Sequence, residues 1–514
     1  MKKVLFCLSL AAITCILTFS VNLPDYDLWA RLAVGSIFFQ TGHVLKHDIF
    51  SYLPTKDLWI DHEWGSSVVF YFLTKYLGEW GIFALKAIII FAIFILIIKI
   101  IKLQLIKKPA GIFYFIFLGC ALIPGIASLI RCQMFTYLFF TLWIYVLERV
   151  RRGENQLIWI FPATMLLWVN MHGGFLAGIG LILIYALGEL FNQKNYLKYF
   201  GILALIIPVT LLNPYGLEFW HYIIEAAAMQ RPYIPEWHSI NLSGPFHMFA
   251  GIKIHILVCF MIFVLLTVIA GIKLLIQREK PDWTKIILVI VLFYLSIKHQ
   301  RHTEFFILAV SGLFYHHYVN LFGPIENFIK SKLIDNNYKL WDSIKYSFGY
   351  LLLGAICVYS IPKLSHSIIV DPSSYPVGSL EFIKQNNISG NLATTYVWGS
   401  YAFWKLYPQC KVLIDGRYEE VYSNNLFNKA MQLSQHEGDW QEILKDYHTD
   451  ILVLSKRKYT PSDISTLTDW KLVYQDMSSV VLLPKEKFKP DYVYPDYKNP
   501  IYWTEDFSKK VDLN

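Results

Sequence analysis

Long apolar segments separated by short polar ones fill the first 364 residues of the chain. A transmembrane helix needs roughly 20 apolar residues, and fewer where a neighbouring bundle shields it. The pattern predicts about eleven such helices. They lie near residues 4–21, 82–103, 111–130, 133–148, 156–171, 174–191, 198–213, 251–275, 285–298, 304–321 and 346–363, and residues 65–80 predict a surface or re-entrant helix before the second span.

From about Ser365 the pattern becomes that of a small α/β domain. Short apolar runs between polar turns predict strands, and amphipathic runs predict helices. The predicted domains are a transmembrane domain over 1–364, with a first external loop at 22–81, an α/β domain over 365–487 and an irregular tail over 488–514. The expected α/β elements are helices at Gly378–Gln385 and Asn425–Leu433, strands at Lys411–Ile414 and Asp450–Leu454, and a hairpin of Lys471–Gln475 with Val480–Leu483.

The composition is that of a polytopic membrane protein. Of the residues 55% are hydrophobic and 16% charged, with a mean hydropathy of +0.42, whereas a soluble chain carries about a quarter charged residues. The net charge of +8 predicts no nucleic-acid partner, because Lys and Arg in membrane proteins mark cytoplasmic loops. The seven cysteines form no CxxC pair. The first apolar run closes without the small residues that signal cleavage needs, so it favours a membrane anchor.

The basic residues predict the orientation of the spans. Lys2 and Lys3 precede the first span, and further clusters follow the second, fourth, sixth, eighth and tenth. All six clusters fall on one side, which is then cytoplasmic. We therefore expect a multi-pass protein of the cell inner (plasma) membrane, with a cytoplasmic N-terminus and a periplasmic or extracellular α/β domain. The later clusters are Lys99, Lys102, Lys107 and Lys108; Arg149, Arg151 and Arg152; Lys194 and Lys198; Lys273, Arg278, Lys280 and Lys285; and Lys330, Lys332, Lys339 and Lys345.

The first external loop is the most polar stretch on the opposite side. Asp25 and Asp27 follow the first span directly, and carboxylates there can act as a base on a hydroxyl or hold a divalent cation. The alternative is that they cap the next helix, for which Asp27 is well placed. Asp48, His62 and Glu63 lie further along the loop. Asp61-His62-Glu63 could hold a metal but matches no standard zinc signature, and a charged first helical turn is the alternative.

The other external turns carry cations. Arg131, Arg231 and Arg301 lie near membrane depth, and arginine binds phosphate bidentately. Contact with phospholipid headgroups is the simpler interpretation for any one of them. Arg301 stands between His299 and His302, and ionisable groups at such positions usually face a cavity. His172, in a tight glycine-rich turn, is as consistent with a structural role as with a functional one.

Two stretches carry a resemblance to a known family. The pattern D-x-D-L-W…L-A-x-G…G-H…H-D-I-F-S-Y…W-I-D-H-E-W, from Asp25 to Trp64, resembles the first external loop of GT-C superfamily membrane glycosyltransferases. The stretches Thr395–Trp404 and Val412–Arg417 are similar in position to the WWDYG region, and to the strand-Asp motif that follows it, in oligosaccharyltransferase catalytic subunits. This chain has no WWDYG, so the resemblance implies a related enzyme rather than an oligosaccharyltransferase.

The resemblance implies a polytopic GT-C-like fold and transfer of a sugar from a polyprenyl-phosphate-linked donor to an unidentified glycan, lipid or protein acceptor. Asp27 is then the catalytic position, with Asp25 beside it and a possible Mg or Mn ion on Asp27 and Glu63. The expected contacts to donor or acceptor are Asp48, His62, Glu63, Arg131, His172, Arg301, Trp398 and Tyr401, with the aromatic rings of Tyr396, Trp398 and Tyr401 stacking on sugar. Anchoring at the membrane interface is the alternative for those rings.

Two other classes of function fit the composition. A transporter of lipid or sugar would carry charges near the bilayer midplane and inverted repeats, and no repeat is visible in the sequence. A non-catalytic membrane scaffold for envelope assembly would need its polar loops only to cap the helix bundle. Convergence of the acidic loop and the cationic turns on one cavity would favour the enzyme.

Overall fold

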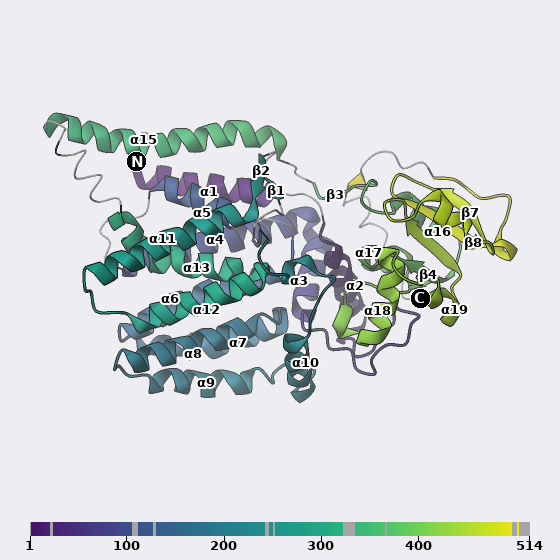
Figure 1. Cartoon of the computed structure of the whole chain (residues 1–514), viewed down its shortest axis with the longest axis horizontal. Helices are drawn as coiled ribbons and strands as arrows, with labels where there is room; N and C mark the ends of the chain where they lie inside the picture. The colour runs from purple at the N-terminus through teal and green to yellow at the C-terminus, as the bar shows by residue number, and fades with distance from the viewer. Residues whose placement is uncertain are drawn as a thin grey trace. The chain divides into compact units, whose positions relative to one another are not determined.

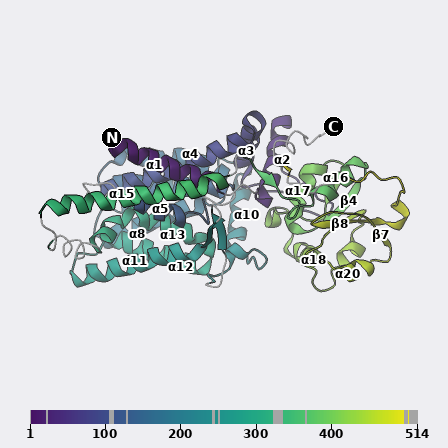
Figure 2. The ribbon, with the colours of Figure 1, turned by 90° about the horizontal axis from the view of Figure 1, so that it is seen from above.

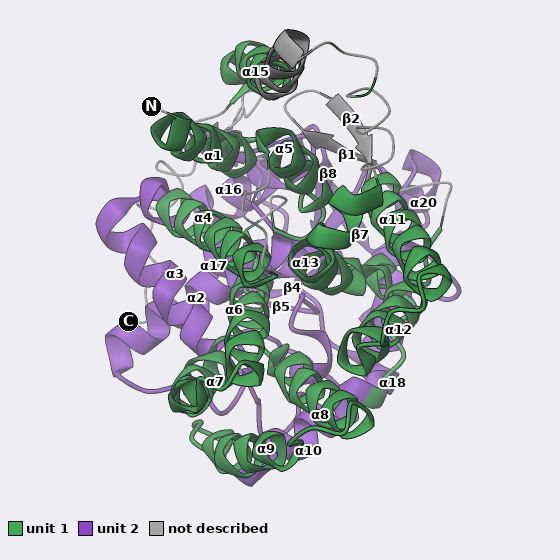
Figure 3. Ribbon diagram, turned by 90° about the vertical axis from the view of Figure 1, so that its left-hand side faces the viewer, with its two compact units in different colours: residues 1–21, 83–216, 228–366 green, residues 22–82, 217–227, 367–514 purple. Residues whose placement is uncertain are grey.

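The computed structural model describes residues 2–20, 24–104, 111–126, 130–241, 246–249, 252–321, 331, 335–364, 367–495 and 501–502. The chain forms two compact units (Figure 3). Unit 1 contains residues 1–21, 83–216 and 228–366, and unit 2 contains residues 22–82, 217–227 and 367–514. The predicted domains are consecutive along the chain, whereas these units are not, because the first external loop groups with the C-terminal residues.

Unit 1 is built from helices, which Figure 3 shows nearly end-on. Several of these helices are apolar on nearly all sides, as expected of helices in a membrane bundle. Among the described residues they are α1 (Lys2–Phe19), most of α4 (Glu79–Leu103), α5 (Ile112–Ala121), α6 (Gln133–Arg151), α7 (Ile160–Met171), α8 (Phe175–Phe191), α9 (Leu197–Val209), α11 (Ile256–Ile276), α12 (Trp283–Lys298), α13 (Thr303–Leu313) and α15 (Asp335–Ser360), with a hairpin of β1 (Phe246–Phe249) and β2 (Ile252–His255) before α11.

Each of the eleven predicted spans overlaps one of these helices. Among the described residues, three helices are long and apolar enough to cross a membrane: Lys2–Phe19, Glu79–Leu103 and Leu257–Ile276. Shorter apolar helices are Ile112–Ala121, Phe175–Phe191, Leu197–Val209 and Ser347–Lys363. The number of spans therefore stays a prediction. Residues 21, 127–129 and 251 of the predicted spans lie outside the described residues, as do Lys107, Lys108, Lys330 and Lys332.

Neighbouring helices of unit 1 pack along their lengths (Figure 1). α8 contacts α6, α9 and α12, while α13 contacts α6, α11 and α12. Small residues permit the close approaches that hold helices together in a membrane. A Cβ on Gly188 of α8 would overlap Thr284 of α12, and a Cβ on Gly312 would lie 2.7 Å from Cγ2 of Ile100.

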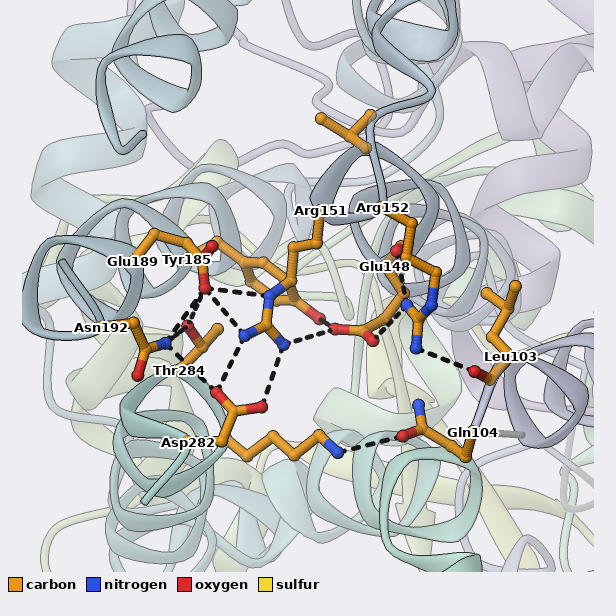
Figure 4. A network of polar contacts seen from close by, with 12 residues as sticks. Leu103, Gln104, Glu148, Arg151, Arg152, Tyr185, Glu189, Asn192, Asp282 and Thr284 are labelled. Carbon is orange, nitrogen blue, oxygen red and sulfur yellow. Dashed lines mark hydrogen bonds and ion pairs between the residues drawn. The ribbon is translucent and has the colours of Figure 1, made fainter. Parts of the chain in front are cut away.

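A partly buried polar network joins the ends of α6, α8 and α12 (Figure 4). The guanidinium of Arg151 pairs with Glu148 at 3.1 Å, Glu189 at 2.8 Å and Asp282 at 2.9 Å. Arg152 also pairs with Glu148, at 2.8 Å. Two of the basic residues that predict the cytoplasmic side are thus neutralised by carboxylates and tie three helices together.

Unit 2 combines the first external loop with the C-terminal part of the chain. Two helices come from the loop, and α2 packs against both α3 and α17. Its described elements are α2 (Tyr26–Thr41), α3 (Trp64–Leu77), α10 (Leu217–Ala228), β3 (Ile369–Val370), α16 (Val377–Gln385), β4 (Gly390–Thr394), α17 (Tyr396–Leu406), β5 (Cys410–Val412), α18 (Asn424–Gln435), α19 (Glu442–Asp446), β6 (Ile451–Ser455), α20 (Pro461–Ser465), β7 (Trp470–Gln475), β8 (Ser479–Pro484) and β9 (Ile501–Tyr502).

A five-stranded mixed sheet in the order β5-β4-β6-β8-β7 forms the core of the C-terminal part. β4 is parallel to β5 and β6, with Leu392 opposite Val412 and Ile451. β8 is antiparallel to β6 and β7. In Figure 2, α16 lies on one side of the strands and α18 and α20 lie on the other. The residues of β6 are all buried, as expected for a strand covered on both faces.

The sequence pattern found most elements of this part. The two predicted helices correspond to α16 and α18, the two predicted strands to β5 and β6, and the hairpin to β7 and β8. The helix predicted at 65–80 corresponds to α3. The pattern missed β4, α10 and the helical nature of α17. Residues 488–495 of the tail form no helix or strand, β9 pairs with β3, and residues 496–500 and 503–514 lie outside the described part.

Candidate active site

The start of α2 presents Asp27 to solvent. The helix begins at Tyr26, and its N-cap is Asp25, whose side chain accepts a hydrogen bond of 3.0 Å from the backbone N–H of Asp27. The expectation that Asp27 itself caps the helix is wrong, because Asp27 lies in the first turn. Asp25 is only 1% exposed, whereas Asp27 is exposed. The two carboxylates therefore have different roles: one is buried and ends the helix, and the other is at the surface.

Aromatic side chains fix the start of α2 against the C-terminal residues of unit 2. Trp29 packs on Tyr401 at 4.7 Å between ring centroids and donates a hydrogen bond of 3.3 Å to the hydroxyl of Tyr375. That hydroxyl donates to the carbonyl of Pro24 at 3.1 Å. Residues more than 300 positions apart thus share one small core, which sets the position of the turn that carries Asp27.

The expected stacking role of two aromatic residues needs correction. Trp398 is 4% exposed and donates a hydrogen bond of 2.9 Å to the carbonyl of Ser374, and Tyr401 is fully buried. Neither ring offers a face to a sugar or to a membrane interface. They belong to α17, whose buried face packs on α2. Tyr396, at the start of α17, keeps partial exposure.

The turn after β5 completes the surroundings of Asp27. α17 lies so close to this segment that a Cβ on Gly399 would overlap the carbonyl oxygen of Ile414. In the following Asp415-Gly416-Arg417 turn, a Cβ on Gly416 would overlap Oδ1 of Asp27. The Asp27 carboxylate therefore lies directly over the backbone of Gly416. Burial, and then the negative charges of Asp27 and Glu419, raise the pKa of the Tyr396 hydroxyl.

Arg417 fixes this turn from inside the unit. Its guanidinium makes two hydrogen bonds of 2.7 Å to the two carboxylate oxygens of Asp415 and pairs with Asp48 through Nη1. Burial acts to lower the Arg417 pKa, but these two carboxylates raise it well above its ordinary value. The rings of Phe50, Trp59 and Phe403 surround the guanidinium, with centroids 4.7–5.2 Å from Cζ. Asp48, predicted to contact a substrate, is instead a buried partner of Arg417.

A second charged cluster surrounds Arg31. Its guanidinium pairs with Asp61, lies 3.6 Å from Glu63 and lies 3.7 Å from Glu420. Nδ1 of His62 lies 3.0 Å from Glu420, which also accepts a hydrogen bond from Trp59. Burial acts to lower the pKa of His62, but the carboxylates of Glu420, Glu63 and Asp61 outweigh it and raise that pKa to about 9. His62 is therefore protonated near neutral pH.

The residues of this unit do not fit the suggested metal site. Glu63 lies beside two cations, the guanidinium of Arg31 and the imidazolium of His62. Among the described residues no group of three His, Cys, Asp or Glu side chains could hold a metal ion. We therefore derive no catalytic step through a cation on Asp27 and Glu63.

The predicted cationic residues lie in unit 1. Arg131 and Arg301 share the carboxylate of Glu236, at 2.6 and 3.2 Å. Arg301 and Arg231 also stack on the ring of Trp237, each with Cζ 4.4 Å from the centroid. Burial acts to raise the pKa of Glu236, but Arg301 and Arg131 lower it. Arginines from three separate turns are thus gathered at one loop.

His172 has the interactions of a structural residue. It ends α7, and its Nδ1 lies 2.9 Å from the hydroxyl of Thr136 and accepts a hydrogen bond of 2.9 Å from the N–H of Gly174. Thr136 in turn accepts a hydrogen bond from Trp168. These contacts favour the structural interpretation of this histidine over a role in binding.

The predicted site residues therefore fall into two groups. Unit 2 contains Asp25, Asp27, Asp48, His62, Glu63, Trp398 and Tyr401, and unit 1 contains Arg131, His172 and Arg301. The closeness of the acidic group to the arginines stays a prediction. The sequence patterns did not identify Glu419 and Glu420 as members of the acidic group, or Gly416 as the residue that lies against Asp27. An Asp-Gly-Arg turn at the end of a buried strand was the signal that could have found them, since side chains at strand ends often build sites.

Comparisons with known proteins find similarity in fold but none in sequence. The sequence matches no protein-family model and no curated protein sequence. Among solved structures, the archaeal oligosaccharyltransferase AglB from Archaeoglobus fulgidus, in complex with an inhibitory peptide and a dolichol-phosphate, is similar over 88% of this chain and 69% of its own, with 10% identity and a TM-score of 0.60.

Two further structures are similar over nearly the whole chain. ArnT from Cupriavidus metallidurans, bound to undecaprenyl phosphate, is 13% identical, with a TM-score of 0.50 over 94% of this chain and 97% of its own. The arabinofuranosyltransferase AftD from Mycobacteria is 13% identical, with a TM-score of 0.53 over 93% of this chain and 40% of its own. These likenesses show a distant GT-C-like fold, which is the fold that the resemblance in the sequence implies.

Proposed function

We propose that the chain is a membrane glycosyltransferase of GT-C type. It moves a sugar from a polyprenyl-phosphate-linked donor to an acceptor on the external face of the inner membrane. The observation that carries the proposal is the position of Asp27, an exposed carboxylate just after the first apolar helix that lies over the Gly416 turn. The lipid phosphates bound to AglB and ArnT support the class of donor.

Asp27 acts as the general base in this proposal. Its carboxylate takes the proton of an acceptor hydroxyl, and the oxygen forms a bond to the anomeric carbon of the sugar. The bond from that carbon to the phosphate oxygen breaks, and its electron pair leaves with the polyprenyl phosphate. A positioned general base contributes about 10²–10⁴-fold to the rate, so Asp27 accounts for a large part of the catalysis.

The leaving phosphate needs a positive partner. Negative charge grows on it in the transition state, where groups that are already in place help most. Arg131 and Arg301 hold the two oxygens of one carboxylate between them, and two oxygens of a phosphate present a similar target. We therefore assign the donor phosphate to Arg131 and Arg301.

The other residues of unit 2 serve the acceptor side. His62 and Glu63 keep 19% and 17% of their side-chain surface exposed, so both remain accessible to an acceptor. Asp25 and Asp48 are buried and act on the position of their neighbours. Unit 2 is then the extracytoplasmic part that shapes the acceptor site, and unit 1 is the membrane part.

The experiment is a transfer assay in proteoliposomes. The purified chain is given radiolabelled polyprenyl-phosphate hexoses and pentoses, with extracted envelope glycolipids as acceptors, and loss of label from the donor is followed. Asp27→Ala and Asp27→Asn should lower the rate about 10²–10⁴-fold. Asp57→Asn, which changes an exposed aspartate of the same unit, should leave the rate unchanged.

Two results would count against the proposal. Full activity of Asp27→Ala with normal folding would remove the assignment of the base. No transfer by the wild-type chain from any donor of the panel, with intact folding, would favour a membrane scaffold instead.

A further inference from the structure

We infer that Gly416 is a positioning residue for the Asp27 carboxylate: the absence of a side chain at this point of the Asp415-Gly416-Arg417 turn leaves the space that the carboxylate occupies. The inference rests on the proposed function, in which Asp27 is the base. It adds that Gly416, far from Asp27 in the sequence, determines the position of the Asp27 carboxylate.

The backbone conformation at position 416 does not require a glycine. A glycine is required where φ is positive, but Gly416 lies outside that region, unlike Gly390, with φ 129°, or Gly438, with φ 55°. Alanine could adopt the backbone conformation of Gly416 without strain. The reason for a glycine here is therefore space rather than conformation.

The side chain of Asp27 occupies the space beside Gly416. An added Cβ would overlap Oδ1 of Asp27, while its next contacts, at 3.5 Å to Oγ of Ser400 and 3.6 Å to Cγ of Asp27, are ordinary. The overlapping atom is the end of a short side chain that can rotate away. A methyl group at position 416 would thus move the carboxylate and leave the fold intact.

The turn itself cannot move aside. Asp415 and Arg417 are buried, and Arg417 is tied both to Asp415 and to Asp48. The hydroxyl of Tyr422 donates a further hydrogen bond of 2.6 Å to Asp415. On the other side, the N–H of Gly416 donates to Oγ of Ser400 at 3.4 Å. The Gly416 backbone is therefore a fixed surface, and Asp27 is the group that gives way.

The first test compares three glycine-to-alanine variants in the transfer assay. Gly416→Ala should lower kcat about 100-fold, the effect of misplacing a catalytic group by about 1 Å, with KM for the donor within about twofold and the melting temperature unchanged. Gly201→Ala should change nothing, since no atom lies within 4 Å of its added Cβ. Gly399→Ala should fail to fold, since its Cβ would overlap the backbone of Ile414.

A double-mutant cycle with Asp27→Ala separates positioning from folding. If Gly416 acts through Asp27, adding Gly416→Ala to Asp27→Ala should lower the residual rate no further. A further loss in the double variant, or activity of Gly416→Ala within about threefold of wild type, would overturn the inference. Full activity of Asp27→Ala would instead overturn the proposed function.

A cross-link tests the apposition without any substrate. A disulfide needs two cysteine side chains that face each other at close range, and the Cβ position on Gly416 lies 3.6 Å from Cγ of Asp27, the atom whose place the sulfur of a cysteine at position 27 would take. The double variant D27C/G416C should therefore give a 27–416 disulfide on mild oxidation, detected as a linked peptide by mass spectrometry. D57C/G416C serves as the control, and equal yields in the two variants would overturn the inference.

Discussion

Two arginines with little exposed side-chain surface, Arg151 in unit 1 and Arg417 in unit 2, each pair with carboxylates but hold different parts of the molecule. Each guanidinium is removed from solvent, with side-chain exposures of 10% and 0%, and each is paired with at least two carboxylates. In isolation such pairs add little to stability, because desolvation offsets the attraction between the charges. Both sets of ion pairs therefore act mainly by fixing the positions of the segments that they join.

The difference lies in what each arginine holds. Arg151 joins helix ends, and its partners have further hydrogen bonds from Tyr185, Asn192 and Thr284 (Figure 4). Arg417 holds a single turn, and that turn carries Gly416 under the Asp27 carboxylate. The ion pairs of Arg151 thus hold helices together in unit 1. Under our proposal, those of Arg417 position a catalytic group in unit 2.

Removal of the two cations should give the largest effect. Arg417→Met leaves Asp48 and Asp415 buried without their cation, so we expect a loss of about 3–5 kcal/mol in the free energy of unfolding. Arg151→Met should cost less, about 2 kcal/mol, because Arg152 still pairs with Glu148. Urea unfolding in mild detergent measures both. Equal losses would mean that the two clusters are held in the same way.

The cluster around His62 should respond to pH, because a histidine can lose its charge near neutral pH, whereas an arginine keeps it. The pKa of His62 is about 9 in the folded chain and about 6.5 in an unfolded one. Its contribution, roughly 3 kcal/mol, is complete below pH 6.5, falls as pH rises and is lost above about pH 9. The free energy of unfolding between pH 6 and 9.5 should therefore decline in wild type.

The matched variant for this decline is His62→Gln, which keeps a polar side chain without the titrating charge. Its stability should be lower at pH 6 and nearly flat across the same range. Parallel curves for wild type and variant would show that His62 is not the group responsible for the decline.

Loss of the Asp25 cap should give the smallest effect. Asp25→Ala leaves the N–H of Asp27 without its side-chain acceptor, and a lost N-cap costs about 1 kcal/mol. Asp25→Ser keeps an oxygen at that position and should recover most of the loss. Thermal unfolding of both variants measures it. A loss as large as that of Arg417→Met would show that Asp25 does more than end α2.

Local patterns along the chain predicted the helices, the strands and the class of fold well. The eleven apolar segments all overlap helices, and β5, β6 and the β7–β8 hairpin lie where the apolar runs lie. These features depend on neighbouring residues, since burial of an apolar face repeats with the period of the element. The missed strand β4, Gly390–Thr394, is short, with a partly polar sequence, and is defined by its two neighbours in the sheet.

The sequence alone predicted a helical protein with many apolar segments, located an acidic loop after the first of them and singled out Asp27 as the candidate base. It could not show that Asp25 rather than Asp27 caps α2, that Trp398 and Tyr401 are core residues, or that Asp48 is the partner of Arg417. The last two facts depend on contacts between residues far apart in the chain, such as Asp48 and Arg417, which are 369 positions apart. Only packing in three dimensions decides such contacts, because a residue's type sets what it can bind, and its neighbours set what it does bind.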